Sequence, residues 1–437
     1  MSGKERFVVG DVLNAHHALG VQFDNPVHQQ KRVPVRQYVA NFVDIQNGHG
    51  VSIITAVDSI LREVKTYQPA MLEMIGQFVA CESPSDDRAA VDRFVDLVCD
   101  TLAPVARVKT IPGGRFGRHV LAEMKLPGRK KSGQILALGH SDTVWPMGTL
   151  RSMPFRNRRG RLFGPGVLDM KAGIAFFIFT ARALRELDLP VPARVLLQLN
   201  SDEEVGSPSS RALTEANARQ SRAVLVLEPG SGLAGKLKTA RKGVGAFTVA
   251  VRGKAAHAGV DFGAGASAVL ELARQIDAIA KFTNLARGIT VNPGVVAGGT
   301  RSNVIAAEAH AEVDIRVARL RDAAALERKF RALKPFDPRC AISVTGGLNR
   351  PPLERTAGVK RLFHTARKLA LELGIELEES STGGGSDGNF TAALGVPTLD
   401  GLGPVGEGAH AASESILVNR IADRTALVAK LLLARLP

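Results

Sequence analysis

Three short aliphatic segments, each followed closely by histidine or acidic residues, constrain the fold of this 437-residue chain most strongly. The segment ILALG precedes His140 and Asp142, VLLQLN precedes Glu203 and Glu204, and AVLVL precedes Glu228. In open α/β sheets, ligands bind beyond the carboxyl ends of the strands. Strands of this kind would bring these side chains to one crevice. The pattern therefore predicts a functional site at one edge of a sheet.

The segments that separate these strands have helical periodicity. We expect strands at residues 134–138, 194–199 and 223–227, with helices at residues 170–187 and 209–217 between them. Aliphatic strands that alternate with helices indicate βαβ units and a mostly parallel, buried sheet. The predicted fold class is therefore α/β.

A different order of elements occupies residues 242–346. We expect the order βαββαβ, with a strand at FTVAVRG, a helix at 265–281, strands at 288–296 and 307–317, a helix at 321–333 and a strand at 341–344. This order predicts a four-stranded antiparallel sheet with helices on one face. It is inserted into the α/β domain, which is formed by residues 53–241 and 347–437. Residues 1–52 have no clear period, and we interpret them as an extension of unknown role.

Two further segments add candidate ligands for a metal. FGPGVLDMKAG places Asp169 in a glycine-bounded loop, and GLGPVGEGAH places His410 after closely spaced glycines. Imidazole nitrogens and carboxylate oxygens are ordinary zinc ligands. There are five candidate ligands: His140, Asp169, Glu204, Glu228 and His410. Five ligands are too many for one tetrahedral ion, but they are enough for two ions that share a bridging carboxylate. Asp142 would then accept a hydrogen bond from His140 and fix its tautomer.

Each of these residues taken alone has an ordinary alternative explanation. His140 fits a hydrogen-bonded core histidine, and Glu203 with Glu204 fits an acidic helix start. Glu228 fits an ion pair with an arginine. Their common position after strands favours the metal site over these alternatives.

The motifs and their order resemble the dinuclear zinc metallopeptidase family that includes glutamate carboxypeptidases, aminoacylases, acetylornithine deacetylase and succinyl-diaminopimelate desuccinylase. The resemblance covers residues 56–437 and rests on GHSDTV, GPGVLDMKAG, NSDEEVGS, LEPG, GKAAHAG, SNVIAAEAHAEVDIR and GGGSDGN. It implies that the α/β domain is the catalytic domain and that the insertion is a dimerisation, or lid, domain. Glutamate carboxypeptidase is the most similar of these activities.

The resemblance also implies a role for each candidate residue. His140 and Glu228 are expected to be terminal ligands of one zinc ion, and Glu204 and His410 those of the other. Asp169 is expected to bridge the two ions and to precede a cis peptide bond. Glu203 is expected to be the general base, because a carboxylate that is not coordinated to metal accepts a proton more readily. Cobalt or manganese are possible substitutes for zinc.

The resemblance further implies contacts with the substrate. His257 of the insertion is expected to reach the active site of a partner subunit and stabilise the oxyanion. Asn303 and Arg316 are expected to contact the substrate, since an arginine can grip a carboxylate with two hydrogen bonds. The glycines of the GGGSDGN motif resemble a backbone cradle for the α-carboxylate of the substrate: Gly383, Gly384 and Gly385.

The expected activity is hydrolysis of the amide bond of an N-acyl or peptidyl amino acid with a free carboxylate. In the family that this chain resembles, carboxypeptidases and aminoacylases have a glutamate at the position of Glu228, whereas aminopeptidases have an aspartate there. A biosynthetic N-acyl amino acid deacylase, of the acetylornithine deacetylase or desuccinylase type, is the alternative.

Composition bears on the partners and the location of the protein. A net charge of +15 and a sequence pI of about 10.1 also suit a nucleic-acid-binding protein, which is a remote alternative. Aromatic residues make up only 5%, which argues against base-stacking platforms. Three widely spaced cysteines and the absence of a secretory signal pattern predict a cytoplasmic protein. We expect a homodimer that binds neither nucleic acid nor membrane.

Overall fold

A computed structural model describes residues 59–436 of the chain. The sequence-based interpretation of residues 1–52 lies outside the described residues. A six-stranded sheet has the order β1-β2-β6-β3-β7-β14, and its members are β1 (Ala106–Pro112), β2 (Arg118–Met124), β3 (Gln134–His140), β6 (Arg194–Asn200), β7 (Ala223–Val226) and β14 (Thr398–Leu399). The pairs β6/β3, β3/β7 and β7/β14 are parallel, and β1/β2 and β2/β6 are antiparallel. The prediction of an α/β fold with a mostly parallel sheet is confirmed.

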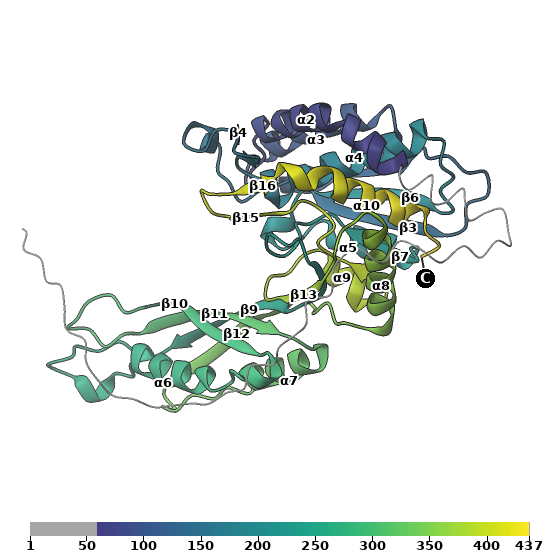
Figure 1. Ribbon diagram of the computed structural model, residues 1–437. Coiled ribbons are helices and arrows are strands. Elements are labelled where there is room, and N and C mark those ends of the chain that lie inside the picture. Colours follow the sequence, from purple (N-terminus) through teal and green to yellow (C-terminus); the bar gives the residue numbers. More distant parts are fainter. Residues whose placement is uncertain (1–58, 437) are drawn as a thin grey trace, which may run out of the picture. The chain divides into compact units, whose positions relative to one another are not determined.

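Both faces of the central strand β3 are buried, which explains why its residues 135–138 are all aliphatic. Successive side chains of a strand point to opposite faces. Ile135 and Ala137 join one hydrophobic cluster, while Leu136 and Leu138 join another. The first cluster includes residues of α2 (Gln68–Ala80), α3 (Arg88–Leu102), α4 (Ala172–Glu186), α8 (Ala357–Glu372) and α10 (Ile421–Leu433). On the opposite face lie α5 (Arg211–Arg219) and α9 (Gly388–Ala393) (Figure 1).

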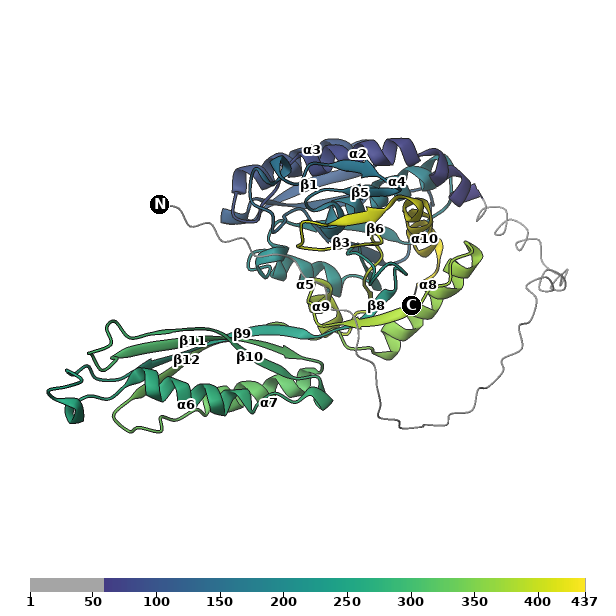
Figure 2. The same cartoon turned by 60° about the vertical axis from the view of Figure 1, so that its left-hand side comes forward.

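A second sheet has its own hydrophobic core. Its strands have the order β10-β11-β9-β12 and pair antiparallel throughout. In chain order the elements are β9 (Gly243–Arg252), α6 (Ala268–Ala280), β10 (Thr290–Gly298), β11 (Glu308–Val317), α7 (Leu320–Arg331) and β12 (Ala341–Arg350). Both helices lie on one face of this sheet (Figure 2), as the βαββαβ order predicts. The domain boundaries at 242–346, 53–241 and 347–437 stay a prediction.

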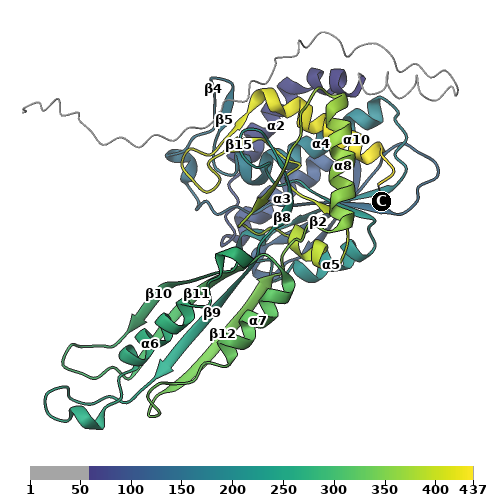
Figure 3. The same ribbon diagram turned by 60° about the horizontal axis from the view of Figure 1, so that its bottom comes forward.

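Two smaller sheets hold the loops around the candidate site. The strands β8 (Leu237–Arg241) and β13 (Glu379–Thr382) pair in parallel, and β8 leads directly into β9 (Figure 3). The other small sheet has the order β15-β16-β5-β4, with β4 (Arg156–Arg158), β5 (Arg161–Phe163), β15 (Gly406–Glu407) and β16 (Ser415–Leu417). No helix within residues 59–436 combines the length and the apolar character needed to cross a membrane.

Candidate functional site

The carboxyl ends of three neighbouring parallel strands supply most of the candidate ligands. His140 is the last residue of β3, and Glu228 follows the end of β7 by two residues. Glu203 and Glu204 begin a short 3₁₀ helix, Glu203–Val205, three residues after the end of β6. Because β6, β3 and β7 run parallel, these ends meet at the same edge of the sheet.

Asp169 lies between two pairs of side chains. Its Oδ1 is 3.1 Å from Nε2 of His140, which is itself 3.5 Å from Oε1 of Glu228. Its Oδ2 is 3.4 Å from Nε2 of His410, which is also 3.4 Å from Oε2 of Glu204. The structure thus brings all five candidate ligands together, in two pairs that share Asp169.

The donor set of this cluster fits divalent cations. Oε1 of Glu204 is fully buried and has no hydrogen-bond partner among the described residues, and a buried polar atom of this kind normally has one. The pKa of His410 is raised to about 10 by its hydrogen bonds with Asp169 and Glu204. Burial raises the pKa of Glu204 to about 7, although His410 opposes the shift. Imidazole and carboxylate donors in this number are suited to zinc.

Glu203 also lies close enough to this cluster to coordinate a metal ion, but its carboxylate already accepts a hydrogen bond from an arginine side chain. One ligand atom each of His140, Glu203 and Glu228 lies within 4.8 Å of the others. Nη2 of Arg350 donates to Oε1 of Glu203 at 2.8 Å and to its carbonyl oxygen at 2.8 Å. Burial raises the pKa of Glu203 well above its usual value, while Arg350 lowers it. This partner distinguishes Glu203 from Glu204.

Asp142 supports both glutamates as well as His140. Its carboxylate accepts the backbone N–H groups of Glu203 and Glu204 at 3.2 and 3.1 Å, and the Ser85 hydroxyl at 2.8 Å. Nδ1 of His140 is 2.9 Å from the carbonyl oxygen of Asp142 and 3.5 Å from its carboxylate. The backbone of Asp142 is therefore closer to the imidazole than the carboxylate that we expected to fix the tautomer.

Glu414, which the sequence analysis did not identify, holds the loop that carries Asp169. Its carboxylate accepts backbone N–H groups of Gly166, Leu168 and Asp169 at 2.9, 2.8 and 3.1 Å, and the indole N–H of Trp145 at 2.7 Å. The peptide bond between Asp169 and Met170 is cis, as the resemblance implies. No sequence motif around Glu414 signals this role.

Arg350 and Asp387 were also missed as parts of the site. Arg350 ends β12, and its Nη2 donates to Asp387 at 3.0 Å as well as to Glu203. Asp387 belongs to the GGGSDGN motif and also accepts hydrogen bonds from Asn200 and Ser207. Its place in this motif was the available signal in the sequence, but its partners come from distant parts of the chain.

The structure brings Arg316 to the glycines of the GGGSDGN motif. Nη1 of Arg316 donates to the carbonyl oxygen of Gly383 at 3.3 Å. Arg241, from β8, donates to the carbonyl oxygens of Gly384 and Gly385 at 3.2 and 2.9 Å. A Cβ atom at Gly383 would meet no atom within 4 Å, so open space adjoins this turn.

His257 and Asn303 lie together, but not at the cluster of their own chain. Both are exposed, and the backbone N–H of Ala258 donates to the carbonyl oxygen of Asn303 at 2.9 Å. They adjoin the end of the second sheet where Glu308 pairs with Arg252, while Arg316 marks the opposite end of β11. At about 3.4 Å per residue, the eight residues from Glu308 to Arg316 span roughly 27 Å.

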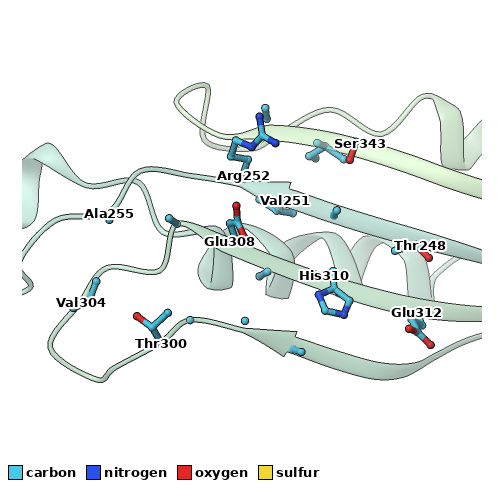
Figure 4. Close-up of a pocket in the computed structure, with 18 residues that line it drawn as sticks. Thr248, Val251, Arg252, Ala255, Thr300, Val304, Glu308, His310, Glu312 and Ser343 are labelled. Atoms are coloured by element: carbon cyan, nitrogen blue, oxygen red, sulfur yellow. The ribbon is translucent and has the colours of Figure 1, made fainter.

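A separate hollow of about 970 Å³ lies over the helix-free face of the second sheet (Figure 4). Thr248, His310, Glu312 and Ser343 line it. None of the candidate site residues takes part in this hollow.

Known proteins resemble the chain over most of its length. Residues 136–434 match the family described as Peptidase family M20/M25/M40. Carboxypeptidase G2 from Pseudomonas sp. (strain RS-16) is 29% identical over 392 residues, which cover 88% of this chain and 94% of that protein. A succinyl-diaminopimelate desuccinylase from Xanthomonas campestris pv. campestris (strain 8004) is 30% identical over 316 residues, which cover 68% of this chain and 81% of that protein.

The fold of the chain is also similar to that of solved structures. Aminopeptidase PepT from Bacillus cereus ATCC 10987 matches with a TM-score of 0.70 at 21% identity, over 84% of this chain and 98% of that chain. The sequence match extends from β3, which carries His140, to α10 beyond His410. The chain is therefore a metal-dependent hydrolase that belongs to Peptidase family M20/M25/M40.

Proposed function

We propose that the enzyme hydrolyses the amide bond of an N-acyl or peptidyl amino acid with a free carboxylate, using two zinc ions. The observation that carries this proposal is the position of Asp169 between His140 on one side and His410 on the other, at 3.1 and 3.4 Å. We assign His140 and Glu228 to one ion, Glu204 and His410 to the other, and Asp169 to both. Metal ions in such a site acidify water and polarise the scissile carbonyl.

Glu203 serves as the general base in this proposal. It accepts a proton from the attacking water and delivers it to the leaving amine nitrogen, as the amide C–N bond breaks. Arg350 keeps the carboxylate oriented through its 2.8 Å hydrogen bond. Asp142 acts as a positioning residue, because it holds the backbone of both glutamates.

The substrate carboxylate binds, we propose, beside Arg316 and the turn formed by Gly383, Gly384 and Gly385. The open space at Gly383 and the adjacent guanidinium of Arg316 support this assignment. The relatedness to carboxypeptidase G2 over 88% of the chain favours a carboxypeptidase-like activity. The biosynthetic deacylase alternative is not favoured, since the desuccinylase match covers only 68% of the chain.

A homodimer completes the site in this proposal. His257 and Asn303 are too far along the second sheet to reach the cluster of their own chain, so we assign them to the active site of a partner subunit. Exposed apolar residues on β10 and α6, including Val295 at 51%, Val296 at 56% and Leu270 at 60% exposure, support a contact between copies. A cytoplasmic location is supported by three free cysteines, Cys81, Cys99 and Cys340.

The test is release of free amino acid from a panel of N-acyl amino acids and dipeptides. The enzyme should act on substrates with a free carboxylate and not on the corresponding C-terminal amides. Chelation should abolish turnover, and added zinc should restore it, with cobalt and manganese compared. Failure to cleave any member of the panel in the metal-loaded state would refute the proposal.

A further inference from the structure

The candidate ligands are held in two different ways. His140 ends β3 and Glu228 follows β7, so both are anchored by the large sheet, and their side chains are 1% and 9% exposed. Asp169 and His410 instead lie on connections outside that sheet, and the side chain of His410 is 50% exposed. These two ligands therefore need support that the large sheet does not supply.

Glu414 connects the two segments that carry these ligands. It is fully buried, four residues after His410 and directly before β16. Its carboxylate binds the backbone around Asp169: Oε1 accepts the N–H groups of Leu168 and Asp169 at 2.8 and 3.1 Å, and Oε2 accepts that of Gly166 at 2.9 Å. The loop of His410 ends at Glu414, so this carboxylate fixes one ligand segment against the other.

A third segment that contacts Glu414 follows β3. Oε2 of Glu414 also accepts the indole N–H of Trp145 at 2.7 Å. Trp145 lies three residues after Asp142, which accepts the backbone N–H groups of Glu203 and Glu204. One carboxylate thus joins three segments that come together around the candidate metal cluster.

The donors around Glu414 require a carboxylate at this position. All four partners are N–H groups, two at each oxygen, and an ionised carboxylate only accepts hydrogen bonds. Hydrogen bonds to a charged acceptor are about twice as strong as neutral ones. A glutamine has one acceptor oxygen and one NH₂ group, so two of the four N–H groups would face another donor. A buried donor without an acceptor is costly.

We infer that Glu414 is a positioning residue for one of the two zinc ions, the second ion, which is the ion assigned to Glu204 and His410. Its carboxylate keeps Asp169 and His410 at the separation at which both reach the same ion. This inference rests on the ligand assignment in the proposed function and extends it. The affinity of the second ion should depend on Glu414, whereas the ion held by His140 and Glu228 should depend on it far less.

The experiment measures how tightly each zinc ion is bound by the wild type, Glu414→Gln and Trp145→Phe. Each protein is stripped of metal and titrated with zinc in competition with a chromogenic chelator, and mass spectrometry counts the bound ions. Trp145→Phe removes one of the four N–H donors and leaves the carboxylate in place. It keeps the inference testable if Glu414→Gln does not fold.

Glu271→Gln is the matched control. Glu271 of α6 is 1% exposed, and its carboxylate also holds a loop, by accepting the backbone N–H groups of Phe336 and Asp337 at 2.9 Å each. It belongs to the core of the second sheet and not to the candidate ligands. Thermal unfolding of the metal-free proteins should show a loss of stability in Glu271→Gln without a change in zinc affinity.

Replacing a residue that supports metal ligands typically costs about 10- to 100-fold in metal affinity, so Glu414→Gln should weaken one ion by this factor and the other by less than about threefold. Trp145→Phe should weaken the same ion by a smaller factor. His410→Ala identifies this ion, because adding Glu414→Gln to it should leave the affinity of the remaining ion nearly unchanged. Excess zinc should restore the second ion and turnover in Glu414→Gln.

The outcomes separate this inference from the proposed function. Equal weakening of both ions in Glu414→Gln, or a loss no larger than in Glu271→Gln, would overturn the role of Glu414. If Glu414→Gln does not fold, an unchanged zinc affinity in Trp145→Phe would overturn it. Because the readout is zinc binding, a wild type that cleaves no substrate would refute the proposed reaction, while selective loss of the second ion in Glu414→Gln would still support the positioning role.

Discussion

Replacing each of two adjacent glutamates with glutamine should separate proton transfer from metal binding. Glu203→Gln removes the proton acceptor, but the amide oxygen can still accept the hydrogen bond that Arg350 donates at 2.8 Å. General acid–base catalysis typically contributes about 10²- to 10⁴-fold, so turnover should fall by this amount. Metal content should stay at the wild-type level.

Glu204→Gln should behave differently, although the two positions share the support of Asp142. Oε2 of Glu204 lies 3.4 Å from His410, and its Oε1 is buried without a partner among the described residues. An amide is a poor zinc ligand, so this variant should lose metal first and activity as a consequence. Excess zinc should restore part of the activity of Glu204→Gln and none of that of Glu203→Gln.

The assay is metal content by mass spectrometry after dialysis, together with kcat at saturating substrate and several zinc concentrations. Unchanged circular dichroism controls for folding. Equal metal loss in both variants, or recovery of Glu203→Gln with zinc, would refute the division of labour between these two residues.

Three further predictions address the dimer, the buried ion pair and the pH dependence of stability. Mixing His257→Ala with Glu203→Gln should restore activity if His257 acts in the partner's site, since one site of a mixed dimer has both groups; demonstrated subunit exchange without recovery would contradict this. Arg241→Met leaves Asp400 buried and unpaired, which should lower the free energy of unfolding by about 3–5 kcal/mol in urea denaturation; a loss below about 1 kcal/mol would show that Asp400 finds another partner. Burial lowers the pKa of His119, so the unfolded chain binds more protons and the free energy of unfolding should fall as the pH drops below about 6.5. The free energy of unfolding should change less steeply with pH in His119→Gln. An unchanged pH dependence in this variant would count against a neutral His119.

The core of the fold and the cluster of candidate ligands could be predicted because their signals are local. Leu136 and Leu138 face one hydrophobic cluster while Ile135 and Ala137 face another, and a strand buried on both faces is aliphatic throughout. His140 ends this strand, so its location follows from the strand itself. By contrast, the strands β1 and β2, which carry charged residues among their apolar ones, were not predicted.

The supporting residues could not be predicted because their partners are distant in sequence. Arg350 and Glu203 are 147 residues apart, and Glu414 and Asp169 are 245 residues apart. Such contacts depend on how the two sheets and their connections pack, which no local periodicity encodes. The separation of His257 from the cluster of its own chain could not be predicted either. The length of roughly 27 Å from Glu308 to Arg316 along β11 follows only from the strand register.

The central claim is that Asp169 is shared by two metal ions while Glu203 binds neither. A crystal structure of the zinc-loaded enzyme, with anomalous data at the zinc edge, tests this claim most directly. We predict two anomalous peaks about 3.5–4 Å apart, one beside His140 and Glu228 and the other beside Glu204 and His410, with one oxygen of Asp169 directed at each. A single peak in the presence of excess zinc, or a peak coordinated by Glu203, would contradict the account.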